Sequence, residues 1–322
     1  MLHTPLCELL DVRVPLIQAG MAVYTSPGLA AAVSNAGALG SLGAWLRPSD
    51  ELRRDLVELR EATDRPFAVN HVVPDLDRDA LELTFDAAPA VVSFALDDAG
   101  DLMDRAHDVG SLVMQQVTTV PQAEAAAAHG ADIIVAQGHE AGGYAGTVTT
   151  LTLVPQVVDA VAPLPVVAAG GIADGRGLAA ALMLGAVGAN IGTRFLASRE
   201  APIGEGWKRA IVDSSSDAWA QLDFWNDLYP TPGQKGYGTR VRAMRTAFIE
   251  RWHERRDDVR RDRRAVLAEL EAAEEAGKYD ELFVVGGQSA GLVDDVLPAA
   301  QIVETFAAEA EATLARARDL VD

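Results

Sequence analysis

The stretch DIIVAQGHEAGGYAG, residues 132–146, joins a short apolar segment to a loop rich in glycine and polar side chains. The apolar part contains β-branched residues and stops at glycine, which is typical of a strand buried on both faces of a parallel sheet. Parallel α/β proteins bind ligands at the carboxyl ends of their strands. Four side chains of the loop can hydrogen-bond or titrate, namely Gln137, His139, Glu140 and Tyr144. The stretch therefore predicts a binding site at a strand end, although an ordinary strand-to-helix loop also contains glycines.

Similar apolar segments recur along the chain and alternate with helical stretches rich in Ala and Leu. Together they give eight strand candidates, at residues 15–19, 39–42, 67–70, 91–95, 112–117, 132–137, 166–169 and 189–191. Recognisable helix starts lie at Ser49 and Asp50, at Pro121 and at Asp174. Eight strands separated by helices predict an α/β protein with a TIM (β/α)8 barrel. A doubly wound open sheet is the alternative that this order of elements leaves.

The composition changes after about residue 200, where tryptophans and a long charged helical pattern follow. We predict a barrel made of residues 1–200 and 280–322, with an appended helical segment at residues 201–279. Between residues 240 and 264, arginines alternate with Asp and Glu at helical spacing, which favours a solvated helix face over an anion-binding patch. The aromatic residues at 219–237 either form a wall that selects substrate size or pack the appended helices against the barrel.

The composition favours a small-molecule partner. The chain has 322 residues and 49% hydrophobic content, enough for a large buried core. Its formal net charge of -20 disfavours binding to nucleic acid or to an anionic membrane. Cys7 is the only cysteine, which excludes an intrachain disulfide and a cysteine metal cluster, and no other metal-site spacing is present. With no signal-like apolar run at its start, the chain is predicted to be cytoplasmic.

Two glycine-rich turns follow the seventh and eighth predicted strands. They are GGIAD at residues 170–174 and GANIGTR at residues 188–194. Backbone N–H groups in such turns bind phosphate, and glycine leaves room for the phosphate to approach. Barrel enzymes commonly build a phosphate site from these two loops. Thr193 can add a hydroxyl, and Arg194 either adds a charge or anchors the barrel rim through a carboxylate.

Several motifs, taken in order, resemble one known family. They are PLIQAGM at residues 15–21, Asn70 at the end of the third strand, QVTTV at 116–120, GADIIVAQGHEAGG at 130–143, PVVAAGGIADG at 165–175, GANIGTRFLAS at 188–198 and GGQSAGLVDD at 286–295. They cover nearly the whole chain and resemble the nitronate monooxygenases, formerly called 2-nitropropane dioxygenases. The resemblance implies an FMN-dependent barrel oxidoreductase. The same superfamily contains flavin enoyl-reductases of fatty-acid synthesis and NADH:quinone reductases, so the motifs leave the substrate open.

The resemblance also implies roles for the matching residues. The implied cofactor-binding residues are Gly20 and Met21 against the isoalloxazine ring, Asn70 and Gln116 at its polar edge, Gln137, Gly138, Gly142 and Gly143 in the loop after the sixth strand, Gly170, Gly171, Gly192 and Thr193 around the phosphate, and Gly287, Gln288 and Ser289 closing the site. For some of these residues an ordinary structural role is the alternative. Met21 can be a core side chain, Asn70 a strand-end cap and Gln288 a turn residue.

One position departs from the family pattern. The family usually has Gly-Gly-His in this loop, with the histidine as catalytic base or proton donor, and this chain has Tyr144 there. Tyrosine has a pKa of about 10 and histidine of about 6.5, so a tyrosine at neutral pH donates a proton rather than accepting one. A neutral nitroalkane needs a base, whereas a nitronate arrives deprotonated. Tyr144 and His139 are therefore the candidate catalytic residues, and His71, which follows Asn70, is a weaker substitute for the base.

Three functions remain. The first is FMN-dependent oxidation of alkyl nitronates by O2 to carbonyl compounds and nitrite. The second is NAD(P)H-dependent reduction, through FMN, of an enoyl thioester or a quinone, with Tyr144 as proton donor. The third is a catalytically silent FMN-binding protein. The expected partners are a small-molecule substrate and O2, with NAD(P)H as an option, without nucleic acid or membrane, and with the oligomeric state open.

Overall fold

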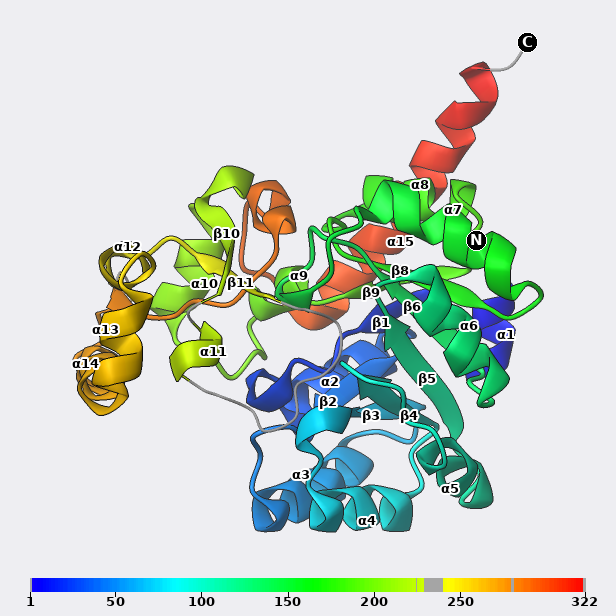
Figure 1. Cartoon of the computed structure of the whole chain (residues 1–322). Coiled ribbons are helices and arrows are strands. Elements are labelled where there is room, and N and C mark those ends of the chain that lie inside the picture. Colours follow the sequence, from blue (N-terminus) through cyan, green and yellow to red (C-terminus); the bar gives the residue numbers. More distant parts are fainter. Residues whose placement is uncertain (1, 224, 229–239, 279–280, 321–322) are drawn as a thin grey trace.

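Eight parallel strands form a barrel that is surrounded by helices (Figure 1). The computed structural model describes residues 2–223, 225–228, 240–278 and 281–320. The barrel strands are β1 (Leu16–Gln18), β2 (Gly40–Gly43), β3 (Phe67–Val72), β4 (Val91–Ala95), β5 (Leu112–Val117), β6 (Ile133–Gln137), β8 (Val166–Ala169) and β9 (Gly188–Ile191). β1 pairs with β9, and a parallel bridge between Ile17 and Leu39 closes the ring on the other side. The predicted (β/α)8 barrel is confirmed, and the open sheet is excluded.

Among the described residues, ten helices accompany the barrel strands. They are α1 (Pro5–Leu10), α2 (Pro27–Asn35), α3 (Ser49–Ala62), α4 (Arg78–Ala87), α5 (Leu102–Asp108), α6 (Val120–Ala128), α7 (Thr150–Val161), α8 (Gly175–Met183), α9 (Thr193–Leu196) and α15 (Ala299–Ala317). The three with recognisable start signals, α3, α6 and α8, begin within one residue of those signals. The side chain of Asp174 caps α8 by accepting a hydrogen bond from the amide of Gly177 at 3.1 Å. No helix in the described part of the chain is both long and apolar enough to cross a membrane.

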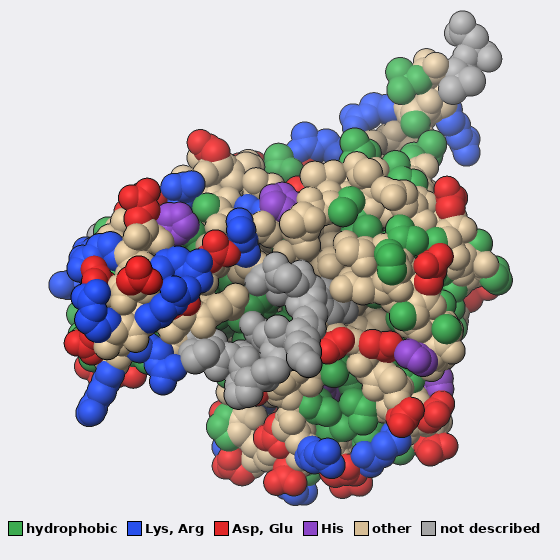
Figure 2. All heavy atoms as spheres, in the orientation of Figure 1, with side chains coloured by type: hydrophobic (Ala, Val, Ile, Leu, Met, Phe, Trp, Pro, Cys, Tyr) green, Lys and Arg blue, Asp and Glu red, His purple; other side chains and the backbone are tan. Residues whose placement is uncertain are grey.

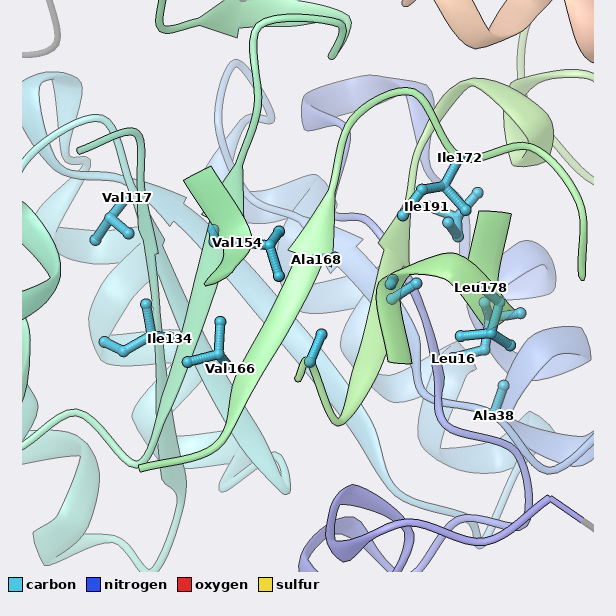
Figure 3. Packing of buried hydrophobic residues seen from close by; sticks show 14 of the residues in the cluster. Leu16, Ala38, Val117, Ile134, Val154, Val166, Ala168, Ile172, Leu178 and Ile191 are labelled. Carbon is cyan, nitrogen blue, oxygen red and sulfur yellow. The ribbon is translucent and has the colours of Figure 1, made fainter. Parts of the chain in front are cut away.

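Each strand divides its side chains between two cores. Outward-facing residues such as Ile134, Val166 and Ala168 pack with Val154 of α7 in the layer between strands and helices (Figure 3). Inward-facing residues such as Ile133, Val135 and Val167 fill the barrel itself, together with leucines of α1. This alternation follows from the two-residue period of a strand. It also means that the next inward position after Val135 is Gln137, at the carboxyl end of β6.

The appended segment is less helical than the sequence suggests. It carries α10 (Glu205–Val212), α11 (Trp225–Leu228), α12 (Ala247–Trp252), α13 (Arg256–Arg261) and α14 (Arg263–Glu275), and also the strands β10 (Trp219–Leu222) and β11 (Arg240–Met244). β11 pairs antiparallel with β10 and with β7 (Gly143–Ala145), which lies in the loop after β6. The strands escape sequence reasoning because β11 contains two arginines, one of them buried. Val285 adds an isolated antiparallel bridge to Ala243 of β11.

The arginine-rich helices of the appended segment are charge-paired. Figure 2 shows Lys and Arg side chains interleaved with Asp and Glu over α12 to α14. Arg251 pairs with Glu269 at 2.6 Å, and Arg256 pairs with Asp227 at the same distance. Mixed signs at short range leave little net charge to hold an anion. The solvated helix face that the sequence favours is therefore what these helices present.

Candidate active site

A cavity opens at the carboxyl ends of the barrel strands, at the edge where polar residues are predicted. It contains about 1240 Å³ of space between atoms, its open mouth included. The predicted site residues that line it are Gly20, Met21, Asn70, Gln116, Gln137, Gly142, Gly143, Tyr144, Gly170, Gly171, Gly192, Thr193 and Ser289. Four predicted residues do not line it, namely Gly138, His139, Gly287 and Gln288. The cavity thus brings together residues that lie up to 269 positions apart in the chain, from Gly20 to Ser289.

The floor of the cavity consists of amide side chains at inward strand ends. Asn70 Nδ2 donates to Ser93 Oγ at 3.0 Å, and Gln116 Nε2 donates to Gln137 Oε1 at 3.1 Å. Asn190 of β9 also lines the cavity, and its buried Oδ1 has no hydrogen-bond partner among the described residues. Sequence reasoning assigned Asn190 no role, yet the two-residue period places it inward after Gly188. A buried acceptor without a partner is costly, and a ligand in the cavity can supply its donor.

Only glycine fits at position 20, where the backbone passes beside the floor of the cavity. A Cβ at this position would lie 2.3 Å from Asn70 Cβ and 3.0 Å from Ser41 Oγ. Because real Cβ atoms do not approach this closely, any other residue forces β1 and β3 apart. The glycine therefore brings the backbone after β1 directly against the Asn70 side chain.

The two glycine turns meet at the far side of the cavity. Gly170 and Gly171 have φ of 95° and 74°, a conformation that favours glycine. Gly192 precedes the first turn of α9, and Thr193 Oγ1 accepts a hydrogen bond from the amide of Gly287 at 2.9 Å. Arg194 lies outside the cavity lining: its guanidinium donates to the carboxylate of Asp295 at 2.6 Å. Of the two roles open for Arg194 from sequence, the rim anchor is the one its contacts support.

Backbone contacts explain the glycines that do not line the cavity. A Cβ on Gly138 would lie 2.0 Å from Thr150 Oγ1. A Cβ on Gly287 would lie 2.9 Å from the backbone carbonyl oxygen of Glu140. The amide of Gln288 donates to that same Glu140 oxygen at 2.9 Å. Gly138, Gly287 and Gln288 therefore hold the cavity wall together through their backbones.

The loop after β6 is fixed from two sides. The Glu140 carboxylate accepts hydrogen bonds from the amide and the hydroxyl of Thr150, each at 2.9 Å. Arg242 of β11 is only 2% exposed. Its guanidinium donates to the backbone carbonyl oxygens of His139 at 2.8 Å and Ala141 at 3.1 Å. Burial lowers the pKa of Arg242, and the nearby Glu140 carboxylate opposes that shift. Sequence reasoning missed Arg242 because it lies in the arginine-rich stretch interpreted as solvated.

The structure separates the two candidate catalytic residues. Tyr144 lines the cavity and is 7% exposed, and its hydroxyl donates to Asn226 Oδ1 at 3.4 Å. His139 points elsewhere: its Nδ1 donates to the oxygen of Gly146 at 3.0 Å. His71 lies on the outward face of β3, where its Nε2 donates to Thr84 Oγ1 at 2.9 Å, and burial lowers its pKa to about 4. Neither histidine lines the cavity, so neither stands where the family histidine is expected.

Comparisons with known proteins agree with this geometry. The nitronate monooxygenase family model matches residues 3–80 and 75–309. The chain belongs to the nitronate monooxygenase family. It is therefore a flavin-type oxidoreductase.

Three relatives show the breadth of chemistry around this family member. A (3aS,4S,5R,7aS)-5-hydroxy-7a-methyl-1-oxo-octahydro-1H-indene-4-carboxyl-CoA dehydrogenase of Mycobacterium tuberculosis is 40% identical over 67% of this chain and 62% of its own length. The structure of FabK from Thermotoga maritima has a TM-score of 0.87 and 34% identity, with 100% of both chains covered. A nitroalkane oxidase from Streptomyces ansochromogenes has a TM-score of 0.84 and 30% identity, covering 96% of this chain and 99% of that one.

The residues of this nitronate monooxygenase family member fit a flavin. A flavin needs flat apolar walls, hydrogen-bond partners for its polar ring edge, and donors for its phosphate. Met21 and Ala19 supply apolar wall, and the amides of the floor supply polar partners. Asn190 Oδ1 offers a buried acceptor, and the positive-φ turn of Gly170 and Gly171 leaves backbone amides uncovered by side chains.

The outer wall brings in residues that sequence reasoning left unassigned. It includes Trp45, Leu46 and Leu96 from barrel loops, and Trp225 from α11. Trp225 lies in the aromatic stretch 219–237 predicted as a possible wall, whereas Trp219 is buried against Gly286 behind it. Residues 229–239 of that stretch lie outside the described residues. A signal for Trp45 and Leu46 exists in the sequence, because they follow the second strand at the barrel's binding edge.

Proposed function

We propose that this enzyme binds FMN and oxidises alkyl nitronates with O2 to carbonyl compounds and nitrite. The observation that carries the proposal is the lack of a base: among the described residues that line the cavity, Tyr24 and Tyr144 are the only ones with titratable side chains. Tyrosine has a pKa of about 10 and is a proton donor at neutral pH. A neutral nitroalkane has to lose a proton before it is oxidised, and a nitronate has already lost it. The cavity therefore suits a substrate that arrives deprotonated.

FMN is the flavin that these residues suit best, because its single phosphate matches the single glycine cradle. We assign the phosphate to Gly170, Gly171 and Gly192, and the ring edge to Asn70 and the paired amides of Gln116 and Gln137. When bound, FMN supplies the one-electron chemistry that links nitronate to O2. Chromatography of the flavin released by heating the purified protein separates FMN from FAD and checks this assignment.

The protein itself contributes charge stabilisation and a dry site. We assign Tyr144, which lines the cavity, to donate a hydrogen bond to the negatively charged nitronate oxygens in place of its long bond of 3.4 Å to Asn226 Oδ1. Apolar side chains of the outer wall exclude water, which strengthens that hydrogen bond. His139 is not proposed as a catalytic residue, because its imidazole bonds the Gly146 carbonyl and does not reach the cavity.

The test compares a neutral nitroalkane with its nitronate at one pH, by oxygen uptake and nitrite release. Faster turnover of the nitronate, by about tenfold or more after correction for slow ionisation, is expected where no base is present. Tyr144→Phe is expected to slow nitronate turnover by at least about tenfold, since one donor to the anion is lost. Tyr144→His restores a base and is expected to raise nitroalkane turnover selectively. Equal rates on both substrates in the wild-type enzyme contradict the proposal.

A second function is favoured by the relatives. The Mycobacterium tuberculosis relative is named a carboxyl-CoA dehydrogenase, and FabK of Thermotoga maritima matches the whole chain. An NAD(P)H-dependent FMN reductase acting on an enoyl thioester, or on a quinone, uses Tyr144 as a proton donor rather than as an anion partner. Anaerobic addition of NADH distinguishes the two functions, because bleaching of the flavin by NADH alone supports the reductase and bleaching by nitronate alone supports the oxidase.

A further inference from the structure

The turn between β2 and α3 is anchored on both sides of one apolar residue. On one side, Trp45 Nε1 donates to Asp75 Oδ2 at 2.8 Å. On the other side, the Arg47 guanidinium is 5% exposed and donates to the oxygen of Gly43 at 2.9 Å and that of Thr25 at 2.6 Å. These contacts fix the backbone of the turn. The contacts of Trp45 and Arg47 therefore also fix the position of Leu46, which lies between them.

Leu46 is held in a costly arrangement. Its φ is 62°, in the left-handed region that a leucine rarely adopts, and its side chain is 58% exposed. Glycine or asparagine fits this backbone with less strain, and a polar side chain is better solvated. Neither backbone geometry nor burial in the folded chain explains a leucine here. Backbone strain of this kind collects at ligand-binding sites, where surrounding structure maintains it.

The surroundings of Leu46 form an apolar chamber above the amide floor. Leu46 lines the cavity together with Leu96, whose φ of 71° is also left-handed, and with Trp45, whose ring centroid lies 6.3 Å from that of Tyr144. Trp225 and Val241 of the appended segment complete this side of the cavity. No Lys, Arg, Asp, Glu or His belongs to the cavity lining in the described part of the chain. The part of an occupant that lies against Leu46, Leu96 and Trp225 is therefore apolar, and its polar head group lies elsewhere in the cavity.

We propose that Leu46 and Trp45 are specificity-determining residues that hold the alkyl chain of the substrate, and that the enzyme prefers unbranched chains longer than those of the smallest nitronates. The inference rests on the proposed function, since it places the anionic head group beside Tyr144 and the chain beside Leu46. Each methylene that moves from water into contact with this wall strengthens binding about fourfold. The rigid turn presents the leucine before the substrate arrives, so binding does not have to order it.

The test measures binding without turnover. Linear alkyl carboxylates, from acetate to decanoate, copy the charge and planar shape of a nitronate head group and are not oxidised by this chemistry. Dissociation constants come from the perturbation of the bound flavin spectrum and from tryptophan fluorescence of the holoenzyme. We expect affinity to rise by about two- to fourfold per methylene over the middle of the series. An affinity that does not change with chain length overturns the inference.

Two substitutions at Leu46 separate its role from folding. Leu46→Gly and Leu46→Asn both suit the left-handed backbone, so the thermal midpoint is expected to stay the same or rise. Both are expected to weaken octanoate binding about tenfold while changing acetate binding by less than twofold. Met183→Asn, which removes an apolar side chain that is 72% exposed at the end of α8, serves as the control and leaves the series unchanged. Equal octanoate affinity in wild type, both Leu46 variants and the control overturns the inference.

The outcome is independent of the proposed oxidation. If nitronates are not oxidised and the carboxylate series still depends on Leu46, the chain-binding wall stands and the proposed function fails. If nitronates are oxidised but the affinity for carboxylates does not depend on their chain length, the proposed function stands and the role of Leu46 is refuted.

Discussion

Replacing Arg242 by methionine tests whether the appended segment fixes the loop after β6. The Arg242 guanidinium donates to three backbone oxygens, those of His139 at 2.8 Å, Trp219 at 2.8 Å and Ala141 at 3.1 Å. Hydrogen bonds from a charged donor contribute about 1.5–3 kcal/mol each, so the three together amount to roughly 4.5–9 kcal/mol. Burying the cation costs several kcal/mol, which leaves a net loss of about 2–4 kcal/mol when it is replaced. Methionine retains the apolar stem, so the change isolates the guanidinium.

The assay is thermal unfolding followed by tryptophan fluorescence, with a parallel titration of flavin into the apoprotein. R242M is expected to lower the thermal midpoint by roughly 3–6 °C. It is also expected to weaken flavin binding, because the loop that it releases contributes Gly142 and Gly143 to the cavity wall. R240M is the control: Arg240 lies on the same strand, but its side chain is 56% exposed and pairs with Asp223 at the surface. If R242M matches R240M in both measurements, the barrel alone holds the loop and the reasoning is refuted.

Three further predictions follow from single contacts. Gly20→Ala places a Cβ 2.3 Å from Asn70 Cβ, so we expect a loss of about 1–3 kcal/mol in stability and of bound flavin; unchanged flavin content of the purified variant contradicts this. Burial lowers the pKa of His71 to about 4 from 6.5, so the folded protein keeps it neutral while the unfolded chain takes up a proton. Stability is then complete above pH 6.5 and falls by up to about 3 kcal/mol as the pH drops towards 4, and His71→Asn is expected to flatten this dependence in urea titrations at several pH values. Arg194→Met is expected to lower the thermal midpoint without changing flavin affinity, since Arg194 bonds Asp295 outside the cavity; a weaker flavin affinity assigns it to the phosphate instead.

Local patterns were sufficient to predict the barrel, whereas most of the residues expected at its binding edge came from the family resemblance. Each barrel strand is a short apolar run with a stop signal, and each inward polar residue follows from the two-residue period of its strand. Asn70, Gln137 and Gly170 are examples, because each one lies at or just beyond the end of such a run. Parallel strands bring their carboxyl ends to one edge, so these residues meet in space although no local signal joins them.

Contacts between distant segments were not predictable in this way. Arg242 lies in a stretch rich in exposed arginines, and only its antiparallel pairing with Gly143, about 100 positions earlier, turns its side chain inward. His139 is polar and lies in the loop after β6, but its imidazole hydrogen-bonds the Gly146 carbonyl instead of lining the cavity. Strand pairings across such separations depend on the whole fold, and they decide which side of a loop faces the cavity.

The small sheet links Tyr144, the candidate catalytic residue, to the appended segment. Tyr144 lies on β7, which pairs with β11 of the appended segment rather than with a barrel strand, and Val241 of β11 is its direct partner. The barrel provides the amide floor and the glycine cradle, whereas the position of Tyr144 depends on the appended segment that also contributes Trp225 and Val241 to the wall. Changes at Trp225 and Val241 can therefore alter the substrate side of the cavity and the placement of Tyr144 together, while the amide floor and the glycine cradle of the barrel stay intact.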